Sequence, residues 1–306
     1  MIAIHDIAAQ QACGRVDHAQ HSLNCPELPH ILPRMTNAPR LTDMAALARN
    51  RRRAQTPALF LHATAIDEVQ DRLSMVNRTF QDIAIVTGFP GPWGTAFAQA
   101  QLVPEAETLA LEPGQCDLVI HAMGLHWAND PVGQIIQCRR ALRADGLFLA
   151  VCFGGQTLAQ LRTAWAEAES RLTGGMAPRV APMAEIRDLG GLLQRAGLAL
   201  PVADTLVLQA SYASPRALMR ELRHMGEANA LAHRLRHPTR RAVLHRAEQL
   251  YTQMAGTPDG RVGATFELLF LTAWAPDASQ PQPLRPGSAQ KRLADALGTD
   301  ETPLAD

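Results

Sequence analysis

The sequence lacks any excess of charge. Lys291 is the only lysine among 29 basic residues, which are balanced by 29 acidic ones, so the formal net charge at pH 7 is zero. This balance excludes nucleic acid or an anionic membrane as a partner attracted by bulk charge. There is also no apolar run of membrane-spanning length, and residues 1–11 lack the basic start and apolar core of a signal peptide. We therefore expect a cytoplasmic protein without a transmembrane segment.

Cysteine is scarce as well. None of the five cysteines forms a CxxC pair, and the histidines near Cys13 and Cys25 do not have the spacing of a zinc site. In a chain of this size without a secretion signal, we expect reduced, structural thiols. The sequence therefore predicts no metal site.

Composition divides the chain into three regions. Residues 1–34 are mixed polar without a sustained period, and we expect 1–39 to be a disordered N-terminal extension. From Pro276 the chain is rich in Pro, Gln, Ser and Asp, which predicts a mobile tail over 276–306. One folded domain is expected over 40–275. Near its start, the basic run of Arg49 and Arg51–Arg53 is typical of a solvated helix face.

Strand-like and helix-like patterns alternate within 40–275. Asp130 and Pro131 suit the start of a helix, and Gly146 suits a left-handed turn at its end. The alternation predicts an α/β fold with a mostly parallel sheet whose edge is closed by the two C-terminal strands. Expected strands lie at 80–86, 102–103, 108–111, 117–122, 146–153, 204–212 and 264–274; expected helices lie at 66–76, 92–100, 131–144, 156–172, 186–196, 215–225 and 239–255.

The stretch IVTGFPGPWG, residues 85–94, leaves an apolar strand and turns through three glycines. Ligands of parallel sheets bind beyond the carboxyl ends of the strands. We therefore expect the loops after Thr87, after Ala122 and after Phe153 to converge on one crevice. Taken alone, these glycines are a weak sign of a cofactor loop.

Longer segments carry a family resemblance. LHWANDP, FGGQTL and RDLGGLLQRAG, within residues 117–230, resemble the methyltransferase-like proteins of respiratory complex I assembly, which are relatives of the malonyl-carrier-protein methyltransferase of biotin synthesis. The resemblance runs from about residue 40 to about residue 275. It implies a Rossmann-like class I methyltransferase sheet with helices on both faces, and S-adenosylmethionine as cofactor. Mitochondrial members are associated with hydroxylating an arginine on a complex I subunit.

The resemblance also implies a cofactor site, with departures from the family pattern. The family's first loop reads Asp-Leu-Gly-Cys-Gly-x-Gly or close to it, whereas here Ile85 or Val86 stands in place of the acid. Pro90 and Pro92 remove backbone N–H donors from the loop. The cofactor-binding residues we expect are Thr87, Gly88, Gly91, Glu105, Glu112, Ala122 and Met123.

The chain is short between the first strand and the strand at Asp117. Residues 87–116 must hold what the family builds from two strands and their helices, although one strand–helix–strand unit takes roughly 30 residues. We expect at least one crossover helix to be missing or reduced to a turn. The acid that grips the ribose hydroxyls is then Glu105, with Glu107 second, and Glu112 near the adenine edge. Each of these carboxylates has the alternative of being a solvated surface group.

His126 and Trp127 follow the strand at 117–122 and are the catalytic candidates. An imidazole can act as a general base near neutral pH or as a polar clamp. In the alternative, Trp127 packs under the next helix and His126 bonds locally. Arg179 and Glu227 lie in the segments that carry the resemblance and are candidates for the substrate side.

Three functions are open at this point. The first is an S-adenosylmethionine-dependent methyltransferase with an altered cofactor loop, acting on a protein side chain or a small carboxylate. The second is a non-catalytic assembly factor that binds a respiratory-complex subunit through 174–190 and 215–230. The third, hydroxylation of a partner's arginine, is implied only by the resemblance.

Overall fold

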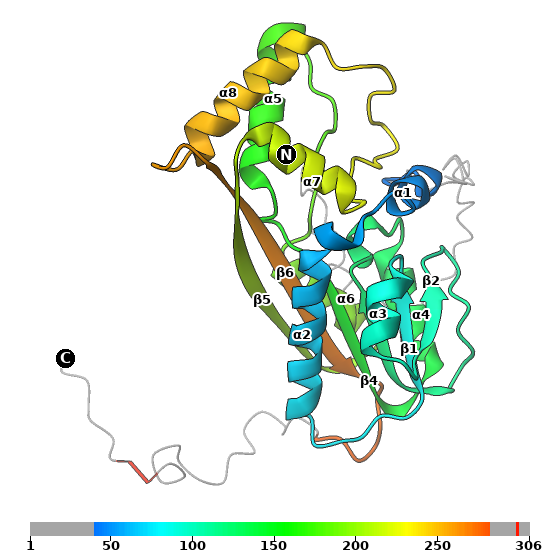
Figure 1. The fold of residues 1–306 in the computed structure, drawn as a ribbon. Helices are drawn as coiled ribbons and strands as arrows, with labels where there is room; N and C mark the ends of the chain where they lie inside the picture. Colours follow the sequence, from blue (N-terminus) through cyan, green and yellow to red (C-terminus); the bar gives the residue numbers. More distant parts are fainter. Residues whose placement is uncertain (1–39, 282–297, 300–306) are drawn as a thin grey trace, which may run out of the picture. The chain divides into compact units, whose positions relative to one another are not determined.

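The computed structural model describes residues 40–281 and 298–299 (Figure 1). Within them, six strands form one sheet in the order β2-β1-β3-β4-β6-β5. The strands are β1 Ile83–Thr87, β2 Gln101–Pro104, β3 Cys116–Ala122, β4 Leu142–Phe153, β5 Ala199–Tyr212 and β6 Val262–Trp274. The helices are α1 Met44–Arg51, α2 Phe60–Met75, α3 Pro90–Ala96, α4 Pro131–Ala141, α5 Ala159–Thr173, α6 Ile186–Arg195, α7 Pro215–His224 and α8 Arg241–Ala255, with short 3-10 turns at Thr56–Ala58 and Leu125–Trp127.

The sheet confirms the predicted α/β fold. Strands β2, β1, β3 and β4 are parallel neighbours, whereas β6 is antiparallel to both β4 and β5. The two C-terminal strands therefore close one side of the sheet, as the sequence predicts. Strand β2 forms the opposite edge, so β1 lies between two parallel partners.

Helices cover both faces of this sheet, because side chains of a strand alternate between its faces. In β1, Ile85 packs in one core cluster with Leu61 and Val69 of α2, and α5 and α8 contribute to the same cluster. Ala84 and Val86 point the other way, into a cluster with residues of α4 and α6. The apolar run 83–86 is continuous for this reason.

The shortening between β1 and β3 is present, and it removes a strand as well as a helix. Only α3 and β2 lie between these strands, and 105–115 forms no helix or strand. The strand predicted at 108–111 is therefore wrong. Leu109 donates its backbone N–H to the Gln137 side chain of α4 at 2.8 Å, so a helix side chain replaces a strand partner there.

Helix α4 also ends earlier than predicted. Asp130 caps it by accepting from the Gly133 N–H at 2.8 Å, as expected, but the helix ends at Ala141 and β4 begins at once. The left-handed residue is Asp145, with φ of 59°, and Gly146 does not take that conformation. Aspartate is among the non-glycine residues that adopt this left-handed conformation most readily. The Asp145 side chain accepts a hydrogen bond from Gln280.

Helix α1 is tied to the segment that follows α7. An isolated antiparallel bridge joins Thr42 to Leu231, and Asn50 donates to the Ala228 carbonyl at 2.9 Å. Just beyond the helix, the Gln55 N–H donates to the His224 carbonyl at 2.8 Å. These bonds place α1 beyond the carboxyl ends of β1 and β2 (Figure 1).

Several expectations concern chain ends and compartments. Within the described residues, no helix combines the length and the apolar character that crossing a membrane requires. Residues 1–39 and most of 276–306 lie outside the described residues, so the three predicted regions stay predictions. Among the described cysteines, Cys116, Cys138 and Cys152 are free and buried, and burial raises the pKa of Cys152 to about 12.

The buried His62 of α2 makes stability depend on pH. Burial lowers its pKa to about 4, and its Nδ1 accepts from the Trp93 indole N–H at 3.1 Å. The unfolded chain binds this proton near pH 6.5, so stability is lost as pH falls from about 6.5 to about 4. We expect His62→Gln, which keeps the acceptor for Trp93, to reduce the slope of unfolding free energy against pH by about 1.4 kcal/mol per unit in that window.

Urea unfolding at several pH values measures this slope. His245→Gln, at an exposed position of α8, is the matched control for losing an imidazole. An unchanged slope in His62→Gln would contradict the buried, neutral state of this histidine.

Candidate functional site

A cleft of about 800 Å³ opens at the carboxyl ends of β1 and β2. Its floor comes from Thr87 and Gly88 after β1 and from residues 102–107 at the end of β2, and α1 forms its opposite wall. We call this the first cavity. Its place at the sheet is where ligands of parallel sheets bind. The predicted residues Thr87, Gly88 and Glu105 all line it.

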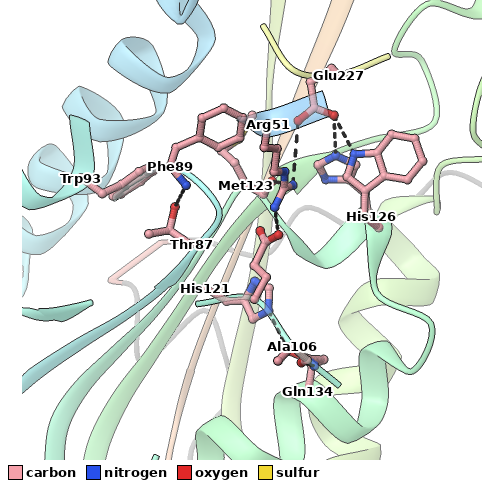
Figure 2. A network of polar contacts seen from close by, with 12 residues as sticks. Arg51, Thr87, Phe89, Trp93, Ala106, His121, Met123, His126, Gln134 and Glu227 are labelled. Atoms are coloured by element: carbon pink, nitrogen blue, oxygen red, sulfur yellow. Dashed lines mark hydrogen bonds and ion pairs between the residues drawn. The ribbon is translucent and has the colours of Figure 1, made fainter. Parts of the chain in front are cut away.

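Arg51, the last residue of α1, projects into the first cavity (Figure 2). Its side chain is only 6% exposed, and it forms an ion pair with Glu105. Nη2 lies 3.4 Å from the Met123 carbonyl oxygen and 3.9 Å from a carboxylate oxygen of Glu227. Burial lowers the pKa of Arg51 and the charge of Glu227 raises it. An arginine stays protonated through such shifts.

Two glycines make room for this ion pair. A Cβ at Gly88 would collide with the Arg51 guanidinium, and a Cβ at Gly124 would collide with the Glu105 carboxylate. Glu105 therefore reaches from the end of β2 to the loop after β3. Met123, beside that loop, has a φ of 56°, which is uncommon for a non-glycine residue. The loops after three parallel strands thus meet around one buried pair of charges.

Glu227 is the second buried carboxylate of the site (Figure 2). It accepts from the Trp127 indole N–H at 2.6 Å, and the same oxygen lies 3.5 Å from His126 Nε2. Burial raises the pKa of Glu227, but His126, the charge of Arg51 and the Trp127 hydrogen bond outweigh it and lower the pKa to about 2. Glu227 is therefore a buried anion at physiological pH.

A second cavity of about 230 Å³ lies on the other side of Glu227. Its walls are apolar and aromatic, and its charged lining residues are Arg179, Arg223 and Glu227. Arg179 is already engaged, because it forms an ion pair with Glu169, donates to Thr239 at 2.7 Å and stacks over Trp165. The remaining lining residues are Trp127, Phe153, Thr157, Leu158, Leu161, Trp165, Val180, Ala181, Met183, Met219, Leu222, Met225, Ala228, Asn229 and Phe266.

The two cavities meet at the Arg51–Glu227 contact. Arg51 lines the first cavity, Glu227 lines the second, and 3.9 Å separates their charged atoms. Both Arg179 and Glu227, the substrate-side candidates, line the second cavity. Such an arrangement can hold one ligand at the sheet edge and a second group beside it.

The loop that carries Glu105 is held by α4. Gln134 donates to the Ala106 carbonyl (Figure 2). Gln137 donates to the Glu107 carbonyl at 3.0 Å. Gln134 in turn faces His121 of β3 at 3.3 Å. Burial lowers the pKa of His121 to about 4, so this histidine is an interior group, as the sequence suggests. Side chains of α4 thus fix the segment where the sheet is shortened.

The structure does not bring every predicted residue to the first cavity. Gly91 lies in the first turn of α3, and Glu112 is exposed on the loop before β3; neither lines the cavity. Pro90 is the first residue of α3, where a missing N–H costs no hydrogen bond. Ala122 and Met123 are buried behind the cavity, and of these only Met123 contacts Arg51.

Of the catalytic candidates, Trp127 lines the second cavity, whereas the buried His126 lines neither cavity. His126 and Trp127 form the 3-10 turn after β3, and both contact Glu227. Trp127 also packs against Leu47 of α1 and Leu231, so the packing role and the polar role coexist. The His126 ring lies 4.8 Å from the Phe153 ring. Their catalytic role stays a prediction.

Arg51 is the site residue that the sequence analysis misses. The prediction that Arg51 lies on a solvated helix face is wrong, because Arg51 is buried against two carboxylates that are more than 50 residues away in the chain. A basic run gives no sign of this. The signal that could have found it is indirect: the first loop has lost its acid, so other charged groups must organise the site. Across 40–281 and 298–299, no three His, Cys, Asp or Glu side chains are grouped to hold a metal.

The strand order, the glycine turn after β1 and the carboxylate after β2 are those of a Rossmann-like sheet of the methyltransferase type. Residues 55–150 match a family model described as a methyltransferase domain. Over this segment the chain is similar to methyltransferase domains. Among solved structures, the YcgJ protein from Bacillus subtilis is matched over 70% of this chain and 100% of that chain, at 10% identity and with a TM-score of 0.46.

Similar sequences carry two different names. The mitochondrial arginine-hydroxylase NDUFAF5 of Danio rerio is 35% identical over 63% of this chain and 60% of its own length, and that of Dictyostelium discoideum is 37% identical over 62% and 43%. The malonyl-[acyl-carrier protein] O-methyltransferase of Laribacter hongkongensis is 34% identical over 60% of this chain and 59% of its own length. The match thus spans less than two thirds of each of these relatives.

The buried charge of Glu227 should make the stability of the fold depend on pH. We expect Glu227→Gln to lower the free energy of unfolding at pH 7 by roughly 1–3 kcal/mol, since a charged hydrogen-bonding partner is lost. A carboxylate with a depressed pKa stabilises the fold above its unfolded pKa of 4.5 and loses this effect as pH falls toward about 2. In urea unfolding, the difference in unfolding free energy between Glu227→Gln and wild type should therefore shrink over that pH range. A difference that is constant from pH 7 to pH 2 would contradict the buried, charged state of Glu227.

Proposed function

We propose that this chain binds S-adenosylmethionine in the first cavity and is a methyltransferase. The observation that carries the proposal is the Glu105 carboxylate. It follows β2 directly, lines the first cavity, and its Oε1 is buried without a hydrogen-bond donor. A carboxylate accepts hydrogen bonds and can hold two neighbouring ribose hydroxyls.

The other residues of the cavity fit the same ligand. Gly88 has no side chain, so the backbone after β1 can approach a ligand closely. The cavity volume of about 800 Å³ falls within the usual range of small-molecule sites. When bound, S-adenosylmethionine supplies a methyl group carried on a positively charged sulfur.

The chain's own residues would prepare an acceptor for that group. His126 is the proposed general base, because its Nε2 faces the Glu227 carboxylate, which can orient the imidazole ring. Trp127 fixes Glu227 through the indole N–H. Arg51, Glu227 and the 3-10 turn thus lie where the two cavities adjoin.

The second cavity suggests the kind of acceptor. The names of the relatives point to two chemistries, a malonyl carboxylate and an arginine guanidinium. A buried anion within aromatic walls favours a cationic group on an apolar stem. Of the cations around Glu227, Arg179 pairs with Glu169, Arg223 is exposed, and Arg51 lies 3.9 Å away and also pairs with Glu105, so none of them is reserved for Glu227. We therefore favour a cationic side chain of a protein as acceptor, and arginine hydroxylation is the alternative reaction at the same site.

A specific observation favours a second candidate, a non-catalytic assembly factor. Arg51 lies against Gly88 and pairs with Glu105, so the chain's own guanidinium already satisfies part of the cofactor cavity. In this alternative the fold binds a respiratory-complex subunit through 174–190 and 215–230, as the family resemblance implies. A cytoplasmic location stays a prediction.

Calorimetric titration with S-adenosylmethionine and S-adenosylhomocysteine tests the proposal. We expect binding by the wild type, and a loss of at least about tenfold in affinity for Glu105→Gln, because charge-assisted hydrogen bonds to the ligand are weakened. Glu112→Gln is the matched control, since that carboxylate is exposed outside the cavity. No heat and no thermal shift at millimolar ligand would favour the assembly-factor candidate.

A further inference from the structure

Arg51 has hydrogen-bonding capacity that the protein does not use. Although the side chain is 6% exposed, its Nε and Nη1 make no well-directed hydrogen bond, and Glu105 Oε1 and Glu227 Oε1 also accept none. Four buried polar atoms without a hydrogen bond in one network of charges are costly, even where an ion pair compensates part of the charge. Because Arg51 and Glu105 both line the first cavity, a ligand there can reach them.

The loop after β1 offers little to a charged ligand group. Its strand carries Ile85 and Val86 where the family pattern has an acid, and α3, which begins at Pro90, has Pro92 in its first turn. The cation over this loop comes from elsewhere in the chain. Arg51 reaches it from α1 and lies against Gly88, where no Cβ intervenes.

We propose that Arg51 is the receptor for the carboxylate of the amino-acid part of the ligand in the first cavity. The inference rests on the function proposed above. On binding, the ion pair between Arg51 and Glu105 breaks. The ligand's carboxylate then pairs with the Arg51 guanidinium, and the ligand's hydroxyls donate hydrogen bonds to the Glu105 carboxylate. In this exchange Arg51 gains a new counter-ion, and the Glu105 carboxylate gains hydroxyl donors in place of the guanidinium.

The chemistry of the guanidinium suits this role. Arginine presents its donors in a planar fork that matches a carboxylate with two parallel hydrogen bonds. The other arginines of the cavity do not compete. Arg40 has a 69% exposed side chain near Glu107, and Arg52 is exposed, so solvent screens both charges. Arg51 is the buried guanidinium among the described lining residues.

A pair of ligands isolates this contact. S-adenosylhomocysteine carries the amino-acid carboxylate, whereas 5′-methylthioadenosine has the same adenosine thioether without the amino-acid part. We expect the wild type to prefer S-adenosylhomocysteine by at least about tenfold in calorimetric titration. Arg51→Met should lose that preference, so that its affinities for the two ligands become similar. Arg53→Met, which removes a charge just beyond α1 and outside the cavity lining, should keep it.

The outcomes separate the two proposals. A preference retained by Arg51→Met overturns this inference and leaves the proposed function standing. Binding of neither ligand by the wild type overturns both. If Arg51→Met does not fold, as thermal unfolding would show, Arg51→Lys replaces it. That variant keeps the charge but not the planar guanidinium, so its preference for S-adenosylhomocysteine should be smaller than that of the wild type. An undiminished preference in Arg51→Lys overturns the inference.

Discussion

The buried contact of Arg51 with Glu105 and Glu227 is the constraint on which the site depends. Removing one charge from such a group leaves an uncompensated ion in the interior, which is strongly destabilising. The three residues come from α1, from the end of β2 and from the segment after α7. Their contact therefore fixes three distant parts of the chain against one another, and it does so where the two cavities meet.

The position of Glu105 in this contact depends on how the shortened part of the sheet is held. With one strand fewer beyond β2, no crossover helix covers the loop that follows it. Gln134 and Gln137 of α4 bind the backbone of that loop instead, and so hold Glu105 at the cavity. A carboxylate thus lines the first cavity directly after β2, although the segment that follows forms neither a helix nor a strand.

Sequence alone predicted most of the fold, because the order of strands and helices follows from apolar periodicity and capping residues. The strand at 108–111 failed since periodicity does not say whether a strand has a neighbour to pair with. Of the site, Glu105 and Glu227 were named from their positions after an element or within a matched segment. Arg51 could not be, because its burial depends on carboxylates far away in the chain, and a charge run on a helix normally faces solvent.

A crystal structure of the full chain with S-adenosylhomocysteine tests the central claim most directly, namely that the Arg51–Glu105 pair is the ligand-binding centre. We predict the ligand in the first cavity, its ribose hydroxyls on Glu105 and its carboxylate on Arg51, with the direct contact between these two side chains broken. A ligand bound elsewhere, with the Arg51–Glu105 pair intact, would contradict the account.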